Sequence, residues 1–300
     1  MPDYAINNPG ELKQAIIRAL AFFDLFDHPL TAYEIWGQLN KQWPLADVCL
    51  FLERTVAIPG TFLEHKNGFY FLRGRAAITA IRPQRHNYST RKLKIARRFA
   101  RLFSVLLCVK LVALANSLGQ NNLRDGSDID FFIISSPRRV WLTRLYCTGL
   151  AKVLNRRPRP TDKKDKICLS FYAATDHLCL DDLRLPGDDP YFDNWRRSLV
   201  VLYNKDNTYE KFLAANGLSP EVHVAEAKKP RRFSPVLDKL EILAKKLQLA
   251  IMPPSLKSVM NSSDGVVVND SILKLYQRDR RREYAEKYGN KVNEIIKENN

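Results

Sequence analysis

The chain has 300 residues, 45% of them hydrophobic, which excludes an intrinsically disordered protein and leaves room for two domains. Its formal net charge of +16 favours a polyanionic partner such as a nucleotide or a nucleic acid. We find neither a signal peptide nor an apolar run that could span a bilayer, and we therefore expect a cytoplasmic protein with no membrane partner. The five cysteines lack the spacing of a zinc site or a disulfide framework, so we expect them to be reduced.

The N-terminal part, residues 10–75, has the element order of a small winged-helix domain. Residues 11–26 carry apolar side chains at helical spacing, and a second helix follows that begins with a capping box. A third helix is predicted over residues 44–56, because a proline stands at its start. The Asn67-Gly68 pair between two strand-like runs then predicts a tight hairpin. Three short helices followed by a hairpin favour a winged helix.

The central part, residues 88–185, is predicted to form a small mixed sheet flanked by helices. The fold class expected for the whole chain is therefore α+β. The expected elements are a helix over 90–107, strands over 109–116 and 127–135, a helix over 137–154 and a strand over 167–174. The remaining residues, 190–300, are interpreted as a helical accessory region, with helices over 232–252 and 272–298 and a short strand-like run between them.

Asp128 and Asp130 are the candidate catalytic and metal-binding residues. They stand two apart at the start of a predicted strand, where side chains alternate, so both carboxylates are expected on one face. Paired carboxylates suit Mg²⁺, a cation that prefers oxygen ligands, and Mn²⁺ is the alternative. Between His65 and Thr161 about twenty Lys and Arg residues surround only three acids, namely these two and Asp125. Acids inside a basic field are what a site for a metal and phosphates requires.

The preceding loop supplies candidate phosphate contacts. An apolar strand ends at Asn116 and Ser117, and ten residues separate Ser117 from Asp128. Across such a loop, Asn116, Ser117 and the Ser127 next to the acids can face the triphosphate of an NTP together with backbone N–H groups.

This pattern resembles the nucleotidyltransferase (polymerase beta-like) superfamily: an apolar strand, Gly-Ser, nine to thirteen residues, then Asp-h-Asp-h, where h is apolar. The matching segment runs from about Leu111 to Ile134, and GSDIDFFII is similar to the corresponding strand of the minimal nucleotidyltransferases. The resemblance implies that residues 88–185 form a nucleotidyltransferase core, that Asp128 and Asp130 bind the metal, and that Ser117 contacts phosphate.

The sequence departs from the family at two points. Asn116 stands where the family has glycine. The family also places a third carboxylate on a later strand, but the strand over 167–174 holds no acid. Cys168, Ser170 or Tyr172 is expected on that face instead, with Asp165 and Asp176 flanking the strand.

Three functions remain open at this stage. The first is an enzyme that transfers an NMP from a metal-bound NTP to an acceptor. If the basic residues bind this acceptor, it is an anionic molecule or a nucleic acid. The second is a nucleotide-sensing or nucleic-acid-binding regulator with a degenerate transferase core, which the missing third acid favours. The third is a non-catalytic scaffold. Arg91, Lys94, Arg98 and Arg101 follow helical spacing, and we expect them to form a row of cations without acidic partners that captures an anionic substrate.

Overall fold

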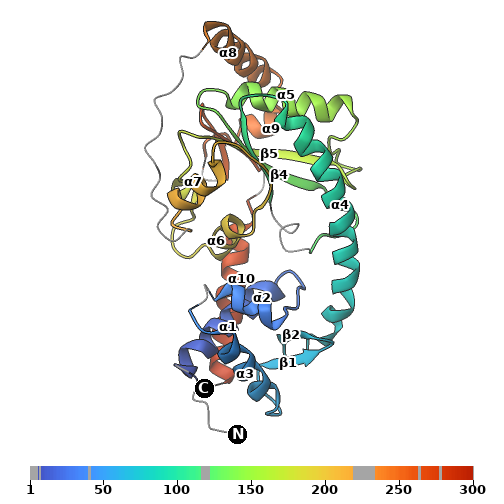
Figure 1. Ribbon diagram of the computed structural model, residues 1–300, viewed down its shortest axis with the longest axis vertical. Coiled ribbons are helices and arrows are strands. Elements are labelled where there is room, and N and C mark those ends of the chain that lie inside the picture. The colour runs from blue at the N-terminus through green and yellow to red at the C-terminus, as the bar shows by residue number, and fades with distance from the viewer. Residues whose placement is uncertain are drawn as a thin grey trace. The chain divides into compact units, whose positions relative to one another are not determined.

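The chain folds into two compact units, each with its own core. The computed structural model describes residues 6, 8–39, 42–115, 122–218, 234–262, 265–276 and 279–299. The first unit consists of Met1–Asn87 and Arg281–Asn300, and the second of Tyr88–Arg280. Figure 1 labels the elements along the chain. None of the described helices is long and apolar enough to cross a membrane.

The first unit combines helices with a two-stranded hairpin. Its elements are α1 (Pro9–Asp24), α2 (Ala32–Gln38), α3 (Leu45–Val56), β1 (Leu63–Lys66), β2 (Phe69–Leu72), a 3-10 helix (Ala76–Ala80) and α10 (Arg281–Glu298), and α4 (Ile81–Ser104) begins here. The C-terminal α10 packs against α1. The three helices and the hairpin therefore lie where the N-terminal pattern predicts them.

Local sequence explains the boundaries of these elements. Thr31 begins α2 with the expected capping box, since its hydroxyl accepts from the Glu34 N–H and Glu34 accepts from the Thr31 N–H. Asn67 and Gly68 have φ of 55° and 81°, the left-handed pair that a type I′ turn requires, and they join β1 to its antiparallel partner β2. An isolated bridge between Leu30 and Tyr70 ties the start of α2 to the hairpin.

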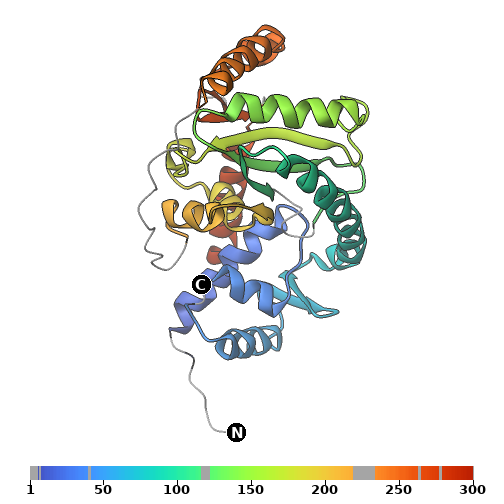
Figure 2. The ribbon, with the colours of Figure 1, turned by 45° about the horizontal axis from the view of Figure 1, so that its top comes forward.

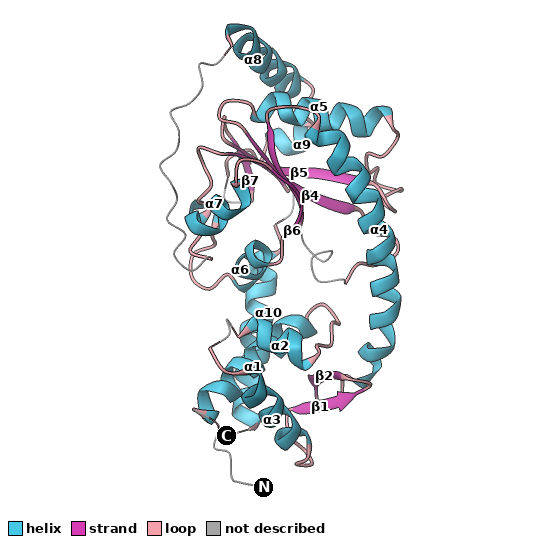
Figure 3. Ribbon diagram, viewed as in Figure 1, coloured by secondary structure: helices cyan, strands magenta, loops and turns pink. Residues whose placement is uncertain are grey.

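The second unit is built on a six-stranded mixed sheet, which Figure 3 shows in magenta. Its strands are β3 (Val109–Leu114), β4 (Ile129–Ser135), β5 (Ile167–Ala174), β6 (Val200–Asn204), β7 (Val266–Val268) and β8 (Ile272–Leu275), in the order β6-β3-β4-β5-β8-β7. Only β4 and β5 pair in parallel among the described strands, because α5 (Val140–Val153) carries the chain back across the sheet between them. The expected α+β class with a mixed, helix-flanked sheet is confirmed.

Helices cover both faces of this sheet. On one face, α4, α5 and α8 (Pro235–Ala250) pack over alternate strand residues such as Phe131 and Ile133. On the other, α6 (Pro190–Arg197) and α7 (Thr208–Ala215) pack over Phe132 and Ile134. Figure 2 shows the helices on either side of the sheet. The short α9 (Pro254–Lys257) leads back toward the strands.

Residues 190–300 differ from the expected helical accessory region. Three strands from this segment, β6, β7 and β8, complete the sheet. Residues 272–275, expected as the first turn of a terminal helix, form β8, and the helix begins at Arg281. Two of these strands, β6 and β8, were not predicted from the sequence. Both are short, mostly apolar runs, and apolar periodicity does not distinguish such a run from part of a helix. Their pairing with β3 and β5 decides their conformation.

Candidate functional site

Asp128 and Asp130 lie where β4 begins. Asp130 is the second residue of β4, and Asp128 directly precedes the strand. Side chains alternate along a strand, so both acids share the face of Phe132 and Ile134, while Ile129 and Phe131 enter the opposite core. The expected common orientation of the two carboxylates is therefore present.

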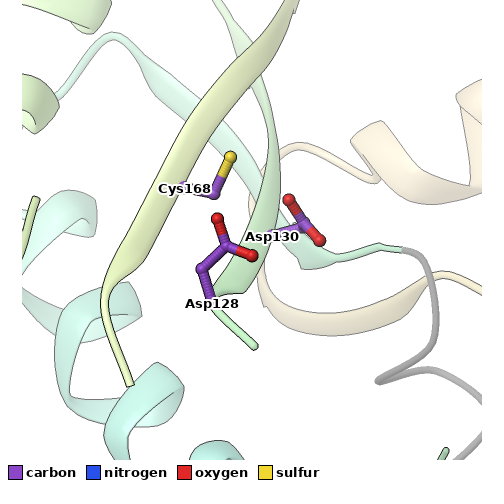
Figure 4. Close-up of side chains that lie close together, drawn as sticks. All are labelled: Asp128, Asp130 and Cys168. Atoms are coloured by element: carbon purple, nitrogen blue, oxygen red, sulfur yellow. The ribbon is translucent and has the colours of Figure 1, made fainter. Parts of the chain in front are cut away.

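Cys168 of β5 completes a three-residue cluster with the two acids. It is the register partner of Asp130 across the parallel pair of strands. One ligand atom from each of Asp128, Asp130 and Cys168 lies within 4.8 Å of the others. Figure 4 shows the two carboxylates and the sulfur turned toward a common space beside the two strands. The Cys168 Sγ also lies 3.1 Å from the Ser170 Oγ.

A bulge in β5 decides which side chains join this face. Asp130 pairs with Cys168, but Phe132 pairs with Phe171, so β5 contributes one extra residue over this stretch. Phe171 consequently packs on the same side of the sheet as Phe132, and Tyr172 packs in the opposite core. The expectation that Tyr172 could share the face of the acids is wrong, because the extra residue reverses the alternation.

The environment of Cys168 keeps its thiol protonated in the absence of a cation. Burial raises the pKa of this thiol well above its ordinary value, and the charges of Asp130 and Asp128 raise it further. A bound cation acts in the opposite direction, because it stabilises the thiolate and offsets the carboxylate charges. The three groups are thus mutually repulsive when ionised, and a divalent cation relieves this repulsion.

A buried lysine holds the ends of both strands. Lys92 of α4 is 0% exposed, and its Nζ donates to the Asp125 carbonyl at 3.0 Å, the Ser127 carbonyl at 2.6 Å and the Asp165 carboxylate at 2.9 Å. Asp165 precedes β5, and Asp125 and Ser127 precede β4. The Asp165 N–H also donates to the Ser127 carbonyl at 3.3 Å. Lys92 therefore fixes the loops from which Asp128 and Cys168 enter the site.

Arg91 reinforces the same junction from the solvent side. Its guanidinium donates to Asp125 at 2.7 Å and to Asp165 at 3.0 Å, and Lys164 donates to Asp125 at 2.7 Å. Hydrogen bonds from Lys164 and then Arg91 lower the pKa of Asp125 to about 2. Burial raises the pKa of Asp165, but hydrogen bonds from Lys92 and Arg91 outweigh it, and the pKa lies below its ordinary value.

These ion pairs correct one expectation and separate the third acid of the basic field from the site. Asp125 is engaged by Arg91 and Lys164 and is no part of the ligand cluster. Arg91 has two acidic partners, so the row of cations without partners is shorter than expected. Its other members, Lys94, Arg98 and Arg101, are exposed.

The remaining candidates lie apart from the cluster. Asn116 and Ser117 fall outside the described residues. Ser127 is described, and its hydroxyl donates to the Arg124 carbonyl at 2.8 Å, so it holds the loop. Asp176 lies just after the C-terminal end of β5, whereas Cys168 lies near the N-terminal end of this strand. Neither Asp176 nor Asp165, which Lys92 engages, supplies a third carboxylate to the cluster.

Comparison with protein-family models, with curated proteins and with solved structures finds no match to this chain. The site is therefore interpreted from its own residues. Lys92 went unrecognised in the sequence, although one signal was present: it precedes Ala96 by four residues and Phe99 by seven, which places it on the apolar face of its helix.

Proposed function

We propose that the chain is a metal-dependent nucleotidyltransferase whose centre is formed by Asp128, Asp130 and Cys168. The proposal depends on one observation, the approach of two carboxylates and a thiol from adjacent parallel strands to within 4.8 Å. Three ligand groups that converge at one end of a sheet form a better site for a divalent cation than two carboxylates in an ordinary surface turn.

The donor set fits a divalent cation and indicates which cations suit it. Two carboxylates alone suit Mg²⁺, while a thiolate suits borderline metals such as Zn²⁺ and is a poor ligand for Mg²⁺. We therefore propose that Asp128 and Asp130 hold the cation, that Cys168 adds a third ligand, and that Mn²⁺ or Zn²⁺ replaces Mg²⁺ as the preferred ion. When bound, the cation would neutralise charge on the phosphates during transfer.

The reaction class follows from this site and from the spacing of its loop. An acceptor oxygen attacks the α-phosphorus of the NTP, the bond to the β-phosphate oxygen breaks, pyrophosphate leaves and the acceptor proton passes to solvent. The protein contributes by holding the two acids and the thiol rigidly through Lys92 and Arg91. Ser117 is proposed to contact phosphate on the strength of the resemblance alone.

The first unit is proposed to be a winged helix that supports the enzyme. An isolated antiparallel bridge from Leu30 to the hairpin lies where a winged helix has its short third strand. The helix that would read DNA, α3, carries Arg54 as its single base, which is too little for reading a major groove. We therefore assign this unit no role in binding nucleic acid.

Metal binding and transfer should be measured together. We expect Asp128→Asn with Asp130→Asn to lower Mn²⁺ affinity at least about 100-fold, because two of three ligands lose their charge. Mn²⁺ electron paramagnetic resonance reports binding, and transfer from α-labelled NTP to a panel of acceptors reports activity. Asp176→Asn is the matched control, since it removes an exposed carboxylate at the far end of β5.

The combined outcome separates the candidate functions. The enzyme is supported if the double variant loses both Mn²⁺ binding and transfer while Asp176→Asn keeps both. Metal and NTP binding that depends on the two acids, without transfer to any acceptor, supports the nucleotide-sensing regulator. Equal Mn²⁺ affinity in the wild type and the double variant rejects the site.

A further inference from the structure

The helix α8 is attached to the sheet domain through polar side chains. Glu241 accepts from the N–H groups of Trp141 and Leu142, both at 2.8 Å, and so caps the start of α5. Gln248 donates to the Trp141 carbonyl at 2.8 Å and accepts from Arg144 at 2.5 Å. Both are buried, at 9% and 3% exposure. The face of α8 that meets α5 is therefore rich in hydrogen bonds.

The apolar face of the same helix points away from this attachment. Val236, Leu240, Leu243 and Leu247, which we call the α8 seam, are between 43% and 65% exposed. Their spacing of four, three and four residues places them along one side of the helix. An ordinary surface helix buries such a stripe, and here the arrangement is reversed. Figure 1 shows α8 resting on α5 at the edge of its unit.

The seam has the pattern of a coiled-coil strand. Its four residues occupy successive d, a, d and a positions of a heptad, and Lys239 and Lys246 then occupy both g positions. Both lysines are exposed, and neither has an acidic partner among the residues that the structure describes. Charges at these flanking positions choose the partner of a coiled coil.

We propose that the α8 seam binds an amphipathic helix of another protein that carries Leu, Ile or Val at its a and d positions and Glu at its flanking positions. Apolar contacts along about 16 Å of helix supply the attraction, since Val236 and Leu247 are eleven steps of about 1.5 Å apart. Glutamates opposite Lys239 and Lys246 supply the charge complementarity.

The same charges disfavour the other occupants. A second copy of the chain would bring lysine against lysine in an antiparallel pair, and the net charge of +16 on each copy adds repulsion. A lipid surface is matched by helices with aromatic anchors, whereas α8 holds no aromatic residue.

Binding of designed peptides tests the proposal. A fluorescent three-heptad peptide with Leu at a and d and Glu at e and g is titrated with the full chain and followed by anisotropy. We expect Leu243→Ser to weaken binding about 30-fold or more, because it removes the centre of the seam. Ile242→Ser is the matched control, since Ile242 is 55% exposed on the same helix but lies off the seam. Both substitutions are at exposed positions, and circular dichroism verifies that the fold persists.

Charge reversal gives an independent readout. The double variant Lys239→Glu with Lys246→Glu should bind a peptide with Lys at e and g more tightly than the peptide with Glu at these positions. A peptide with Ser at every a and d position should not bind, which separates the seam from the general positive charge. Equal effects of Leu243→Ser and Ile242→Ser would overturn the proposal. So would a wild-type dimer in sedimentation that Leu243→Ser dissociates, or binding to phosphatidylserine vesicles but not to the peptide.

Discussion

Replacing Lys92 by methionine tests whether one buried charge organises the site. Methionine preserves most of the length and apolar volume of the side chain, so the core around α4 stays filled. It removes the only charged donor to the Asp125 and Ser127 carbonyls among the described residues, and one of two donors to the Asp165 carboxylate. The Ser127 carbonyl keeps its bond from the Asp165 N–H, whereas the Asp125 carbonyl loses its donor. An unsatisfied buried acceptor costs about 1–3 kcal/mol, and breaking a buried ion pair costs about 3–5 kcal/mol.

The expected loss lies toward the lower part of these ranges. Arg91 still pairs with Asp165, whose side chain is 17% exposed, and water can reach part of the junction. We therefore expect Lys92→Met to lower the free energy of unfolding of this unit by about 3 kcal/mol. Lys94→Met, an exposed lysine two residues away on the same helix, should change it by less than about 0.5 kcal/mol.

Urea unfolding followed by tryptophan fluorescence measures this difference. A background with Trp36→Phe and Trp43→Phe leaves Trp141 and Trp195, which both belong to the unit that contains Lys92. The stability of one unit is then followed without the other. A loss below about 1 kcal/mol would refute the view that Lys92 organises this junction, because even one unsatisfied carbonyl should cost that much.

Three further outcomes are expected. Cys168→Asp should shift the preferred cation from Mn²⁺ toward Mg²⁺, measured as the ratio of the two dissociation constants, and an unchanged ratio would exclude Cys168 as a ligand. The stability that Asp165 contributes should be present above its unfolded pKa of about 3.9 and lost as pH falls through its lower folded pKa, so the unfolding curves of wild type and Asp165→Asn should converge as the solution is acidified. Gly68→Ala should lower the stability of the first unit by about 1 kcal/mol because φ is +81°, whereas Gly126→Ala, in open space at ordinary φ, should not.

Much of the architecture is determined by local sequence. The capping box at Thr31 and the Asn67-Gly68 turn act over a few residues, and both elements form where they were expected. The common face of Asp128 and Asp130 also follows from strand alternation alone. These features are predictable because each depends on neighbours in the chain.

Tertiary structure alone decided the third member of the site. Strand alternation makes Cys168, Ser170 and Tyr172 equal candidates for the face of the acids. The pairing of β5 places Cys168 beside Asp130, and its bulge places Tyr172 in the opposite core. A bulge depends on how two strands pair across a helical crossover, and no short-range pattern in the sequence of β5 predicts it.

Tertiary structure also decided which charges are engaged and which remain exposed. Lys92 and Arg91 are adjacent in a basic helix, but only the fold brings Asp165, which lies more than seventy residues away, against both of them. In the same way, Glu241 and Gln248 attach α8 through backbone groups of α5, and this leaves an apolar stripe in solvent that periodicity alone would place in the core. Periodicity reports that a helix has an apolar side; the partners available in three dimensions determine which side is buried.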